Sequence, residues 1–272
     1  MSKDAKISTQ ERKEDLLKPN GCEQHETHEV SRFDNFVGFV TTRGRHTLFR
    51  GQMSEWPLIP SVGRDQHRSR FRENDRERET LEEFKRESVP YLDYQPVNDW
   101  QWFALAQHNG MPTRLLDWTT NPLVALWFAV KDTPKDRSPG IVWMLWYKEM
   151  EPIYETKDDE VSPLDMNSDS TRIYFPEHIN PSIQAQSGVF TVHQRMENNT
   201  DEFRSLEEEE IGSSFVLKKI TIPADAFPGM CYGLFRVGIS RASLLPGLRG
   251  IAERIRYDNV FREDEKIPGH QQ

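Results

Sequence analysis

The stretch QHNGMPTRLLDWTTNPLVALWFAV, residues 107–130, constrains the fold more than any other part of the chain. Before it, residues 99–109 carry closely spaced apolar side chains, and Gly110 follows where a glycine commonly ends a helix. After it, Asn121 and Pro122 are typical of a helix N-cap and first turn, and they open the apolar helix LVALWFAV. The segment TRLLDWT between these helices mixes polar and apolar residues too densely for a solvated linker. We therefore predict a packed loop between two capped helices, with the second helix in the core.

Three polar residues of this stretch are candidates for chemistry. Arg114 and Asp117 would be costly to bury unpaired, so each needs a partner or a ligand. Because they are three residues apart, an ion pair that fixes the loop is one interpretation and a ligand site is the other. His108 titrates near neutral pH and could act as a general acid or base, or it could be a core histidine bonded to the backbone.

Composition limits the classes of function. The 272-residue chain has a formal net charge of -9, which argues against nonspecific binding to a phosphate backbone. Its two cysteines, Cys22 and Cys231, have no metal-site spacing, so we predict no metal site and no disulfide scaffold. An apolar signal segment and a run of about 20 apolar residues are both missing from the sequence, so we expect a cytoplasmic protein that does not associate with membranes.

The order of sequence patterns predicts an α+β fold, with a small mixed or antiparallel sheet and flanking helices. We expect a polar tail over residues 1–27, one domain over 28–262 with an insertion near 148–180, and a second tail over 263–272. Helical spacing marks residues 30–40 and 81–87, and Ser240 is typical of an N-cap. Strands are expected at 46–52, 140–147, 187–193 and 214–223.

Two further segments carry polar residues suited to ligands. In LFRGQ, Arg50 offers a planar fork for phosphate or carboxylate, and Gly51 would let an anion approach closely. The alternative is that Arg50 pairs with a structural acid. In IQAQSGVFTVH, Gln184 and Gln186 alternate along an expected strand edge, so their amides would point to one face and suit base, ribose or amide recognition. A buried hydrogen-bond network is the alternative there.

Together these motifs resemble the FRG domain family, which is named for its Phe-Arg-Gly motif. The resemblance rests on LFRGQMSEWPLIPSVGR, AQHNGMPTRLLDWTTNPLVALWFAV, IQAQSGVFTVH and GISRASLLPGLRGIA, in that order. It runs from about Val30 to Tyr257. The family is bacterial and phage-associated, and most of its members have no assigned activity.

A weaker resemblance links LFRGQ and TRLLDWTTNPLVALWFA to the ADP-ribosyltransferase superfamily. It implies that Arg50 and Gly51 hold the pyrophosphate of NAD, and that Thr113 and Arg114 orient its ribose. His108 or Asp117 would then do acid–base or charge-stabilising work. Those enzymes carry a glutamate on a later strand, where this chain has Gln184 and Gln186. Either Asp117 or another acid replaces that glutamate, or the NAD chemistry is not performed.

Three functions therefore stay open. The first is an NAD-using ADP-ribosyltransferase-like effector, such as a toxin or phage-defence protein, with a protein or nucleic-acid target and an antitoxin or phage protein as partner. The second is a nuclease-type or other nucleic-acid effector that uses six arginines within residues 64–78. The third is a noncatalytic sensor or interaction module that binds a nucleotide or a phage protein.

Overall fold

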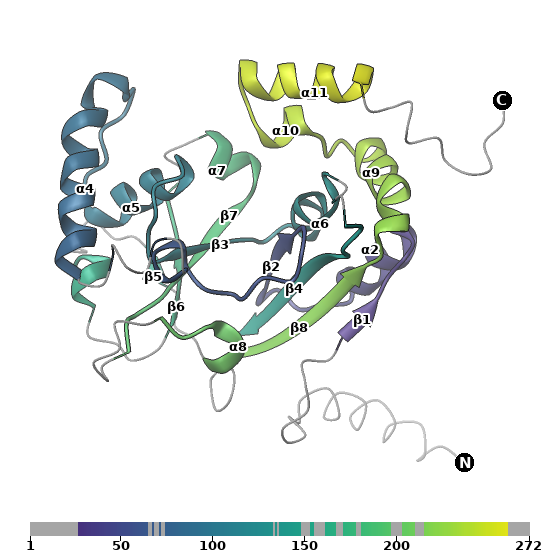
Figure 1. Ribbon diagram of the computed structural model, residues 1–272, viewed down its shortest axis with the longest axis horizontal. Helices are drawn as coiled ribbons and strands as arrows, with labels where there is room; N and C mark the ends of the chain where they lie inside the picture. Colours follow the sequence, from purple (N-terminus) through teal and green to yellow (C-terminus); the bar gives the residue numbers. More distant parts are fainter. Residues whose placement is uncertain are drawn as a thin grey trace, which may run out of the picture.

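The structure is a computed structural model that describes residues 27–64, 67, 71, 74–132, 134, 136–147, 153–154, 161–166, 171–177, 181–196, 203–209 and 215–260. Its centre is one eight-stranded sheet flanked by helices (Figure 1). The strands are β1 (Thr27–Glu29), β2 (Thr47–Gln52), β3 (Leu115–Thr119), β4 (Gly140–Tyr147), β5 (Ile153–Tyr154), β6 (Arg172–Phe175), β7 (Gly188–Val192) and β8 (Phe215–Ile222). The predicted α+β class is confirmed.

The sheet is mixed, with strand order β1-β8-β4-β2-β3-β7-β6-β5. The β1–β8 and β5–β6 pairs are parallel, and the other five pairs are antiparallel. The middle pair is unusual. Strand β2 pairs with β4 at six positions and β3 pairs with β7 at five, whereas β2 and β3 pair only at Phe49 and Thr119.

Helices cover the sheet in two groups. They are α2 (Phe33–Thr41), α4 (Asn74–Ser88), α5 (Asp99–His108), α6 (Pro122–Val130), α7 (Pro181–Ala185), α8 (Leu206–Glu209), α9 (Phe227–Arg236), α10 (Arg241–Leu244) and α11 (Leu248–Val260), with short 3-10 helices η1 (Ser61–Gly63), η2 (Val89–Tyr91), η3 (Pro163–Asp165) and η4 (Ala224–Ala226). Figure 1 shows α4 and α5 at one end of the sheet and α2 and α9 at the other.

The two helix groups form separate cores on the same face of the sheet. Helices α2, α6 and α9 pack over the β2, β4 and β8 side, around Phe49. Helices α4 and α5 pack over β3, β6 and β7, around Leu115. Phe49 and Leu115 share a face because Phe49 pairs with Thr119 and side chains alternate along β3. The opposite face, with Leu48 and Trp118, packs against Leu58.

Helix α6 lies very close to the sheet because two glycines face it. A Cβ atom on Gly51 would lie 1.8 Å from the carbonyl oxygen of Ala125, and one on Gly140 would lie 2.5 Å from that of Ala129. Any side chain at either position would push the helix away from β2 and β4. The prediction that α6 belongs to the core is confirmed, since six of its nine residues are buried.

Most elements lie where the sequence places them. The predicted helices near 30–40 and 81–87 are α2 and α4, and the four predicted strands are β2, β4, β7 and β8. The caps are also confirmed. The Asn121 side chain accepts a hydrogen bond from the Leu123 amide, Gly110 has φ +86° after α5, and Ser240 forms a capping box with Ser243.

Two local predictions are wrong. The segment TRLLDWT is not a loop, because residues 115–119 form β3 inside the sheet. Gln184 and Gln186 do not lie on a strand edge: Gln184 is in α7, and Gln186 lies in the turn between α7 and β7. The expected insertion near 148–180 contributes β5 and β6 to the sheet. Residues 1–26 and 261–272, including Cys22 and most of the expected tails, lie outside the described residues.

Candidate functional site

The candidate site is the place where β2 and β3 separate after their single pair. Arg50 is the next residue of β2 after Phe49, and its Nη1 donates a 2.6 Å hydrogen bond to the carbonyl oxygen of Asp117. The Arg50 side chain on β2 therefore binds a backbone carbonyl of β3. We call this place the β2–β3 split.

Arg50 and Asp117 approach the split from opposite faces of the sheet. Asp117 shares the helix-covered face with Thr119, and Arg50 alternates with Phe49 and so begins on the other face. Nevertheless, Arg50 Nη1 lies 3.7 Å from Asp117 Oδ2. The Arg50 side chain is only 14% exposed, whereas that of Asp117 is 56% exposed. The pair thus joins a nearly buried cation to a solvent-facing carboxylate, between the two helical cores.

Arg50 keeps hydrogen-bonding capacity that the protein does not use. Its Nε is buried and has no hydrogen-bond partner among the residues that the structure describes. Burial lowers the pKa of Arg50 from its usual value, the Asp117 charge opposes that shift, and the nearby Arg64 charge adds to it. Arg64 is exposed and its charge acts on Arg50, while Asp117 is the one carboxylate paired with Arg50 among the described residues. An anion is the ligand best suited to such a place.

A chain of hydrogen bonds fixes Asp117. Gln107 Nε2 donates to Asp117 Oδ2 at 2.8 Å, and Gln107 Oε1 accepts from Thr113 Oγ1 at 2.7 Å. The Thr113 amide donates to Ser61 Oγ at 2.9 Å, which ties the chain to η1. Gln107 lies on α5, and its hydrogen bond restricts the rotation of the Asp117 carboxylate.

His108 ends α5 and lies next to Gln107 in sequence. Burial lowers the pKa of His108 below its usual value, and the charge of Asp117 partly opposes this shift. The ring is therefore neutral at pH 7 and can accept a proton. Arg50 and Asp117, predicted site residues from two separate motifs, thus meet at the split, and the charge of Asp117 acts on His108.

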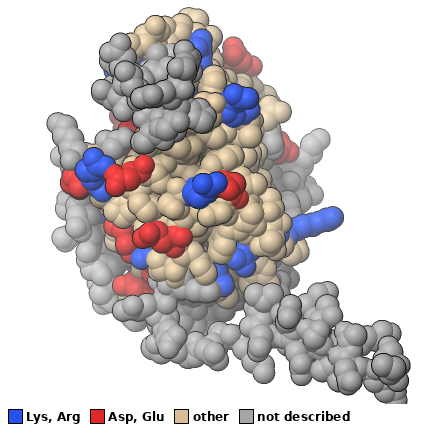
Figure 2. All heavy atoms as spheres, turned by 90° about the vertical axis from the view of Figure 1, so that its right-hand side faces the viewer, with Lys and Arg blue, Asp and Glu red and all other residues tan. Residues whose placement is uncertain are grey.

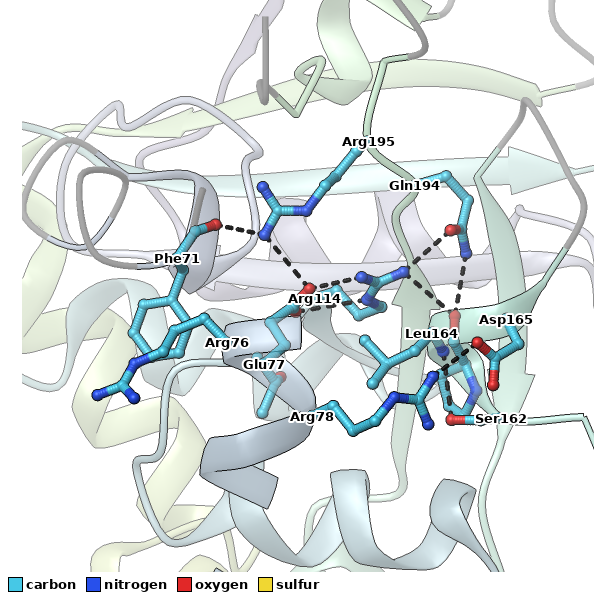
Figure 3. A network of polar contacts seen from close by, with 12 residues as sticks. Phe71, Arg76, Glu77, Arg78, Arg114, Ser162, Leu164, Asp165, Gln194 and Arg195 are labelled. Carbon is cyan, nitrogen blue, oxygen red and sulfur yellow. Dashed lines mark hydrogen bonds and ion pairs between the residues drawn. The ribbon is translucent and has the colours of Figure 1, made fainter. Parts of the chain in front are cut away.

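Arg114 belongs to a different region, which we call the Glu77 network (Figure 3). Arg114 is fully buried, and its Nη2 donates to Glu77 Oε2 at 2.5 Å. Its Nη1 donates to the Pro163 carbonyl and to Gln194 Oε1. Arg195 adds a second cation, 3.4 Å from the same Glu77 oxygen. The carboxylate that pairs with Arg114 is therefore Glu77, and Arg114 has no exposed surface with which to contact a ligand.

The other predicted binding residues have structural contacts. Thr113 is fully buried, and Gly51 faces α6 rather than solvent. Gln186 Nε2 donates to the Leu244 carbonyl of α10 at 3.0 Å, and its own carbonyl accepts from Thr119 Oγ1 at 2.6 Å. Gln184 is exposed on α7. Gln186 therefore joins α10 to the end of β3, two residues from Asp117.

His193 was missed by the sequence reasoning, although the motif FTVH contains it. The ring is fully buried and lies near both Arg50 and Arg114. Burial, then the charges of these two arginines, lowers the pKa of His193 to about 3. Its Nε2 is 3.0 Å from Thr191 Oγ1, and no described residue forms a hydrogen bond with its Nδ1. A histidine at the end of an apolar strand gives no sequence signal that separates this position from a solvated one.

Metal-binding clusters, membrane-spanning helices and the distribution of surface charge also bear on the class of function. The described residues contain no group of three or more His, Cys, Asp or Glu side chains that could hold a metal ion. None of the helices in the described part of the chain is long and apolar enough to cross a membrane. On the face turned to the viewer in Figure 2, basic and acidic side chains are interspersed among the described residues. Much of the arginine-rich segment 64–78 lies outside the described residues.

The comparison with known families concerns the part of the chain that holds the split. Residues 45–138 match the FRG domain. This range covers about a third of the chain and includes β2, α5, β3 and α6. No curated protein and no solved structure matches the chain. The FRG resemblance is thus supported over these residues, and the resemblance to ADP-ribosyltransferases stays a prediction.

Proposed function

We propose that this protein binds NAD at the β2–β3 split and transfers its ADP-ribose to an acceptor. The observation that carries the proposal is the pairing of Arg50, a nearly buried guanidinium whose Nε–H has no partner in the described part of the chain, with the exposed carboxylate of Asp117. NAD needs both features, because it has an anionic pyrophosphate and a ribose that becomes cationic as nicotinamide leaves.

Arg50 would bind the pyrophosphate. Its planar fork suits two phosphate oxygens, and its low exposure strengthens a charged hydrogen bond. Arg64 adds positive charge nearby, as its effect on the pKa of Arg50 indicates. Since the fold already fixes the Arg50 side chain through the Asp117 carbonyl, little side-chain entropy would be lost on binding.

Asp117 would stabilise the transition state. The bond between ribose C1′ and the nicotinamide nitrogen breaks, its electron pair leaves on nicotinamide, and positive charge develops at C1′ and the ring oxygen. A fixed carboxylate in this position lowers the barrier electrostatically. Asp117, held by Gln107, would take the role of the glutamate in the enzymes that the sequence resembles.

His108 would accept the acceptor's proton. As an oxygen, nitrogen or sulfur of the acceptor forms its bond to C1′, it loses a proton to the neutral imidazole. Nicotinamide leaves as a neutral molecule, so charge and atoms balance without a further reactant. The lowered pKa of His108 keeps the ring neutral at pH 7, in the form that can take up the proton.

Two variants test the proposal. We expect Arg50→Lys to weaken NAD binding by about tenfold or more in calorimetry, because lysine keeps the charge and loses the fork. We expect Asp117→Asn to retain NAD binding and to lose transfer of labelled ADP-ribose by about a hundredfold or more. Gln184→Ala, on exposed α7, is the matched control and should change neither quantity.

Three results would contradict the proposal: no saturable NAD binding, equal NAD affinity for Arg50→Lys, or transfer that survives in Asp117→Asn. If wild-type protein slows bacterial growth and folded Asp117→Asn does not, the activity is that of a toxin or defence effector. Growth inhibition by both proteins, without labelled product, would favour the noncatalytic interaction module. DNA or RNA cleavage by the purified protein would favour the nuclease.

A further inference from the structure

A short exposed segment beside α5 presents apolar side chains to solvent. We call residues 89–97 the tyrosine segment. Its exposed large side chains are Val89, Tyr91, Tyr94 and Val97, and Tyr91 is 86% exposed. Val161, also exposed, lies against this region because its carbonyl accepts a hydrogen bond from Trp100 Nε1 at 2.9 Å. Such concentrations of exposed apolar surface mark interaction sites.

The backbone of the tyrosine segment is held in place. Leu92 packs against the core formed by α4 and α5, and Pro96 is buried. The Val97 amide donates to Gln101 Oε1 at 3.0 Å, and Asn98 caps α5. A partner would therefore meet side chains on a fixed backbone, which lowers the entropy lost on binding. Tyrosine is among the residues that contribute most to protein interfaces.

The charges around the segment indicate what kind of partner fits. Glu83, Glu87 and Asp93 are exposed and have no ion pair among the residues that the structure describes. The basic residues within positions 82–97 are Arg86, which is exposed, and Lys85, which is already bonded to two carboxylates. This acidic border repels a nucleic-acid backbone and attracts lysine and arginine.

We infer that the tyrosine segment is a docking surface for a protein segment that carries lysine or arginine beside apolar side chains. Helix α5 connects this surface to the candidate site: it begins next to Val97 and ends at His108, a rise of about 14 Å for its ten residues. A protein docked on the tyrosine segment would thus lie within reach of the β2–β3 split. The inference does not depend on NAD chemistry.

Three labelled peptides of equal length test it by fluorescence polarisation without NAD. One combines lysine with leucine, one has glutamate in place of lysine, and one has serine in place of leucine. We expect only the lysine–leucine peptide to bind. Tyr91→Ser with Tyr94→Ser should weaken it by about tenfold or more, as truncation of an interface tyrosine does. Glu83→Lys with Glu87→Lys should also weaken it and reduce its dependence on salt.

The control is Tyr232→Ser on α9, which is exposed and lies at the other end of the sheet. It should bind like the wild type, and all variants should keep the wild-type melting temperature because their side chains are exposed. Three results would overturn the inference: no peptide binds, the lysine–serine peptide binds equally well, or the tyrosine variants bind normally. A wild-type dimer that Tyr91→Ser converts to monomer would instead assign the surface to self-association.

Discussion

The β2–β3 split and the Glu77 network use the same chemistry in opposite ways. Each joins a carboxylate to an arginine, Arg50 within β2 in one case and Arg114 directly before β3 in the other. In the Glu77 network, Arg114 and Glu77 are both almost completely buried, and further acceptors surround the guanidinium. In the split, Arg50 faces a half-exposed carboxylate, and its Nε is unpaired as far as the described residues extend.

This difference distinguishes an arginine that holds the fold together from one available to a ligand. Burying an ion pair is costly, and removal of one partner strands the other charge. The ion pair and hydrogen bonds of Arg114 therefore stabilise the fold. The described residues satisfy Arg50 only in part, and an unpaired buried polar atom is a reason to look for a ligand. Polar contacts, rather than residue type or motif, separate the two arginines.

The largest expected effect is in the Glu77 network. Glu77→Ala would leave Arg114 buried without its carboxylate and would deprive Arg195 of the same partner. We expect a loss of about 3–5 kcal/mol in the free energy of unfolding, measured by urea denaturation. Asp117→Ala should cost less than about 1 kcal/mol, because the Asp117 carboxylate is itself half-exposed and its contact with Arg50 is 3.7 Å long.

Glu79→Ala is the matched control for that measurement. Glu79 lies on the same helix and pairs with Arg76, but it is exposed, so its loss should change stability by less than about 1 kcal/mol. Equal losses for Glu77→Ala and Asp117→Ala would remove the distinction between the two regions.

A second prediction separates the two residues of the Arg-Gly motif. Gly51→Ala should destabilise the protein by about 1–3 kcal/mol in thermal or urea unfolding, because its Cβ would meet the Ala125 carbonyl and displace α6. Gly38→Ala is the control, since a Cβ on Gly38 has nothing within 4 Å. If Gly51→Ala reduced ligand binding and left stability intact, the motif glycine would serve the ligand after all.

A third prediction concerns His193, which lies near both arginines. Its pKa in the folded protein is about 3, against 6.5 as the ordinary value. Between these values the unfolded chain binds a proton that the folded protein does not. Stability should therefore fall as pH decreases from 6.5, by about 1.4 kcal/mol per pH unit from this residue.

His193→Gln should flatten that dependence when unfolding free energies are compared at pH 7 and pH 5. The variant retains an amide near the Thr191 hydroxyl and cannot titrate. His46→Gln, at an exposed position, should behave like the wild type. If His193→Gln left the pH dependence of stability unchanged, the His193 ring would be hydrated or hydrogen-bonded in solution. Water would then reach the surroundings of His193 near Arg50 and Arg114.

Local sequence patterns predicted much of the fold. Asn121 with Pro122, Gly110 and Ser240 determine helix ends through contacts a few residues long, so the sequence contains the whole signal. β3 was missed because LLDWT is short and lies directly between two helices, and its strand character comes from neighbours β7 and β2. Pro181 at the start of α7 favours a helix where we expected a strand edge.

The site was predicted in part, for a related reason. Arg50, His108 and Asp117 were selected for their chemistry, and the fold brings Arg50 and Asp117 into contact. Arg114 has the same chemistry, but its partner Glu77 is 37 residues away in the arginine-rich segment, where nothing in the sequence marks one acid among many. Gln107 was overlooked because an amide has no reactivity of its own, although it positions the carboxylate.

The single pairing of β2 with β3 has a mechanical consequence. Four strands lie on each side of that junction, and only Phe49 and Thr119 join the two halves by strand pairing. Helix α6 follows β3 in the chain but packs on β2 and β4 of the other half. It therefore links the two halves of the sheet across the β2–β3 junction. Arg50 lies on β2 and Asp117 on β3, on opposite sides of the same junction. A ligand held by both would fasten the halves together, and slower hydrogen exchange along β2 and β3 would record it.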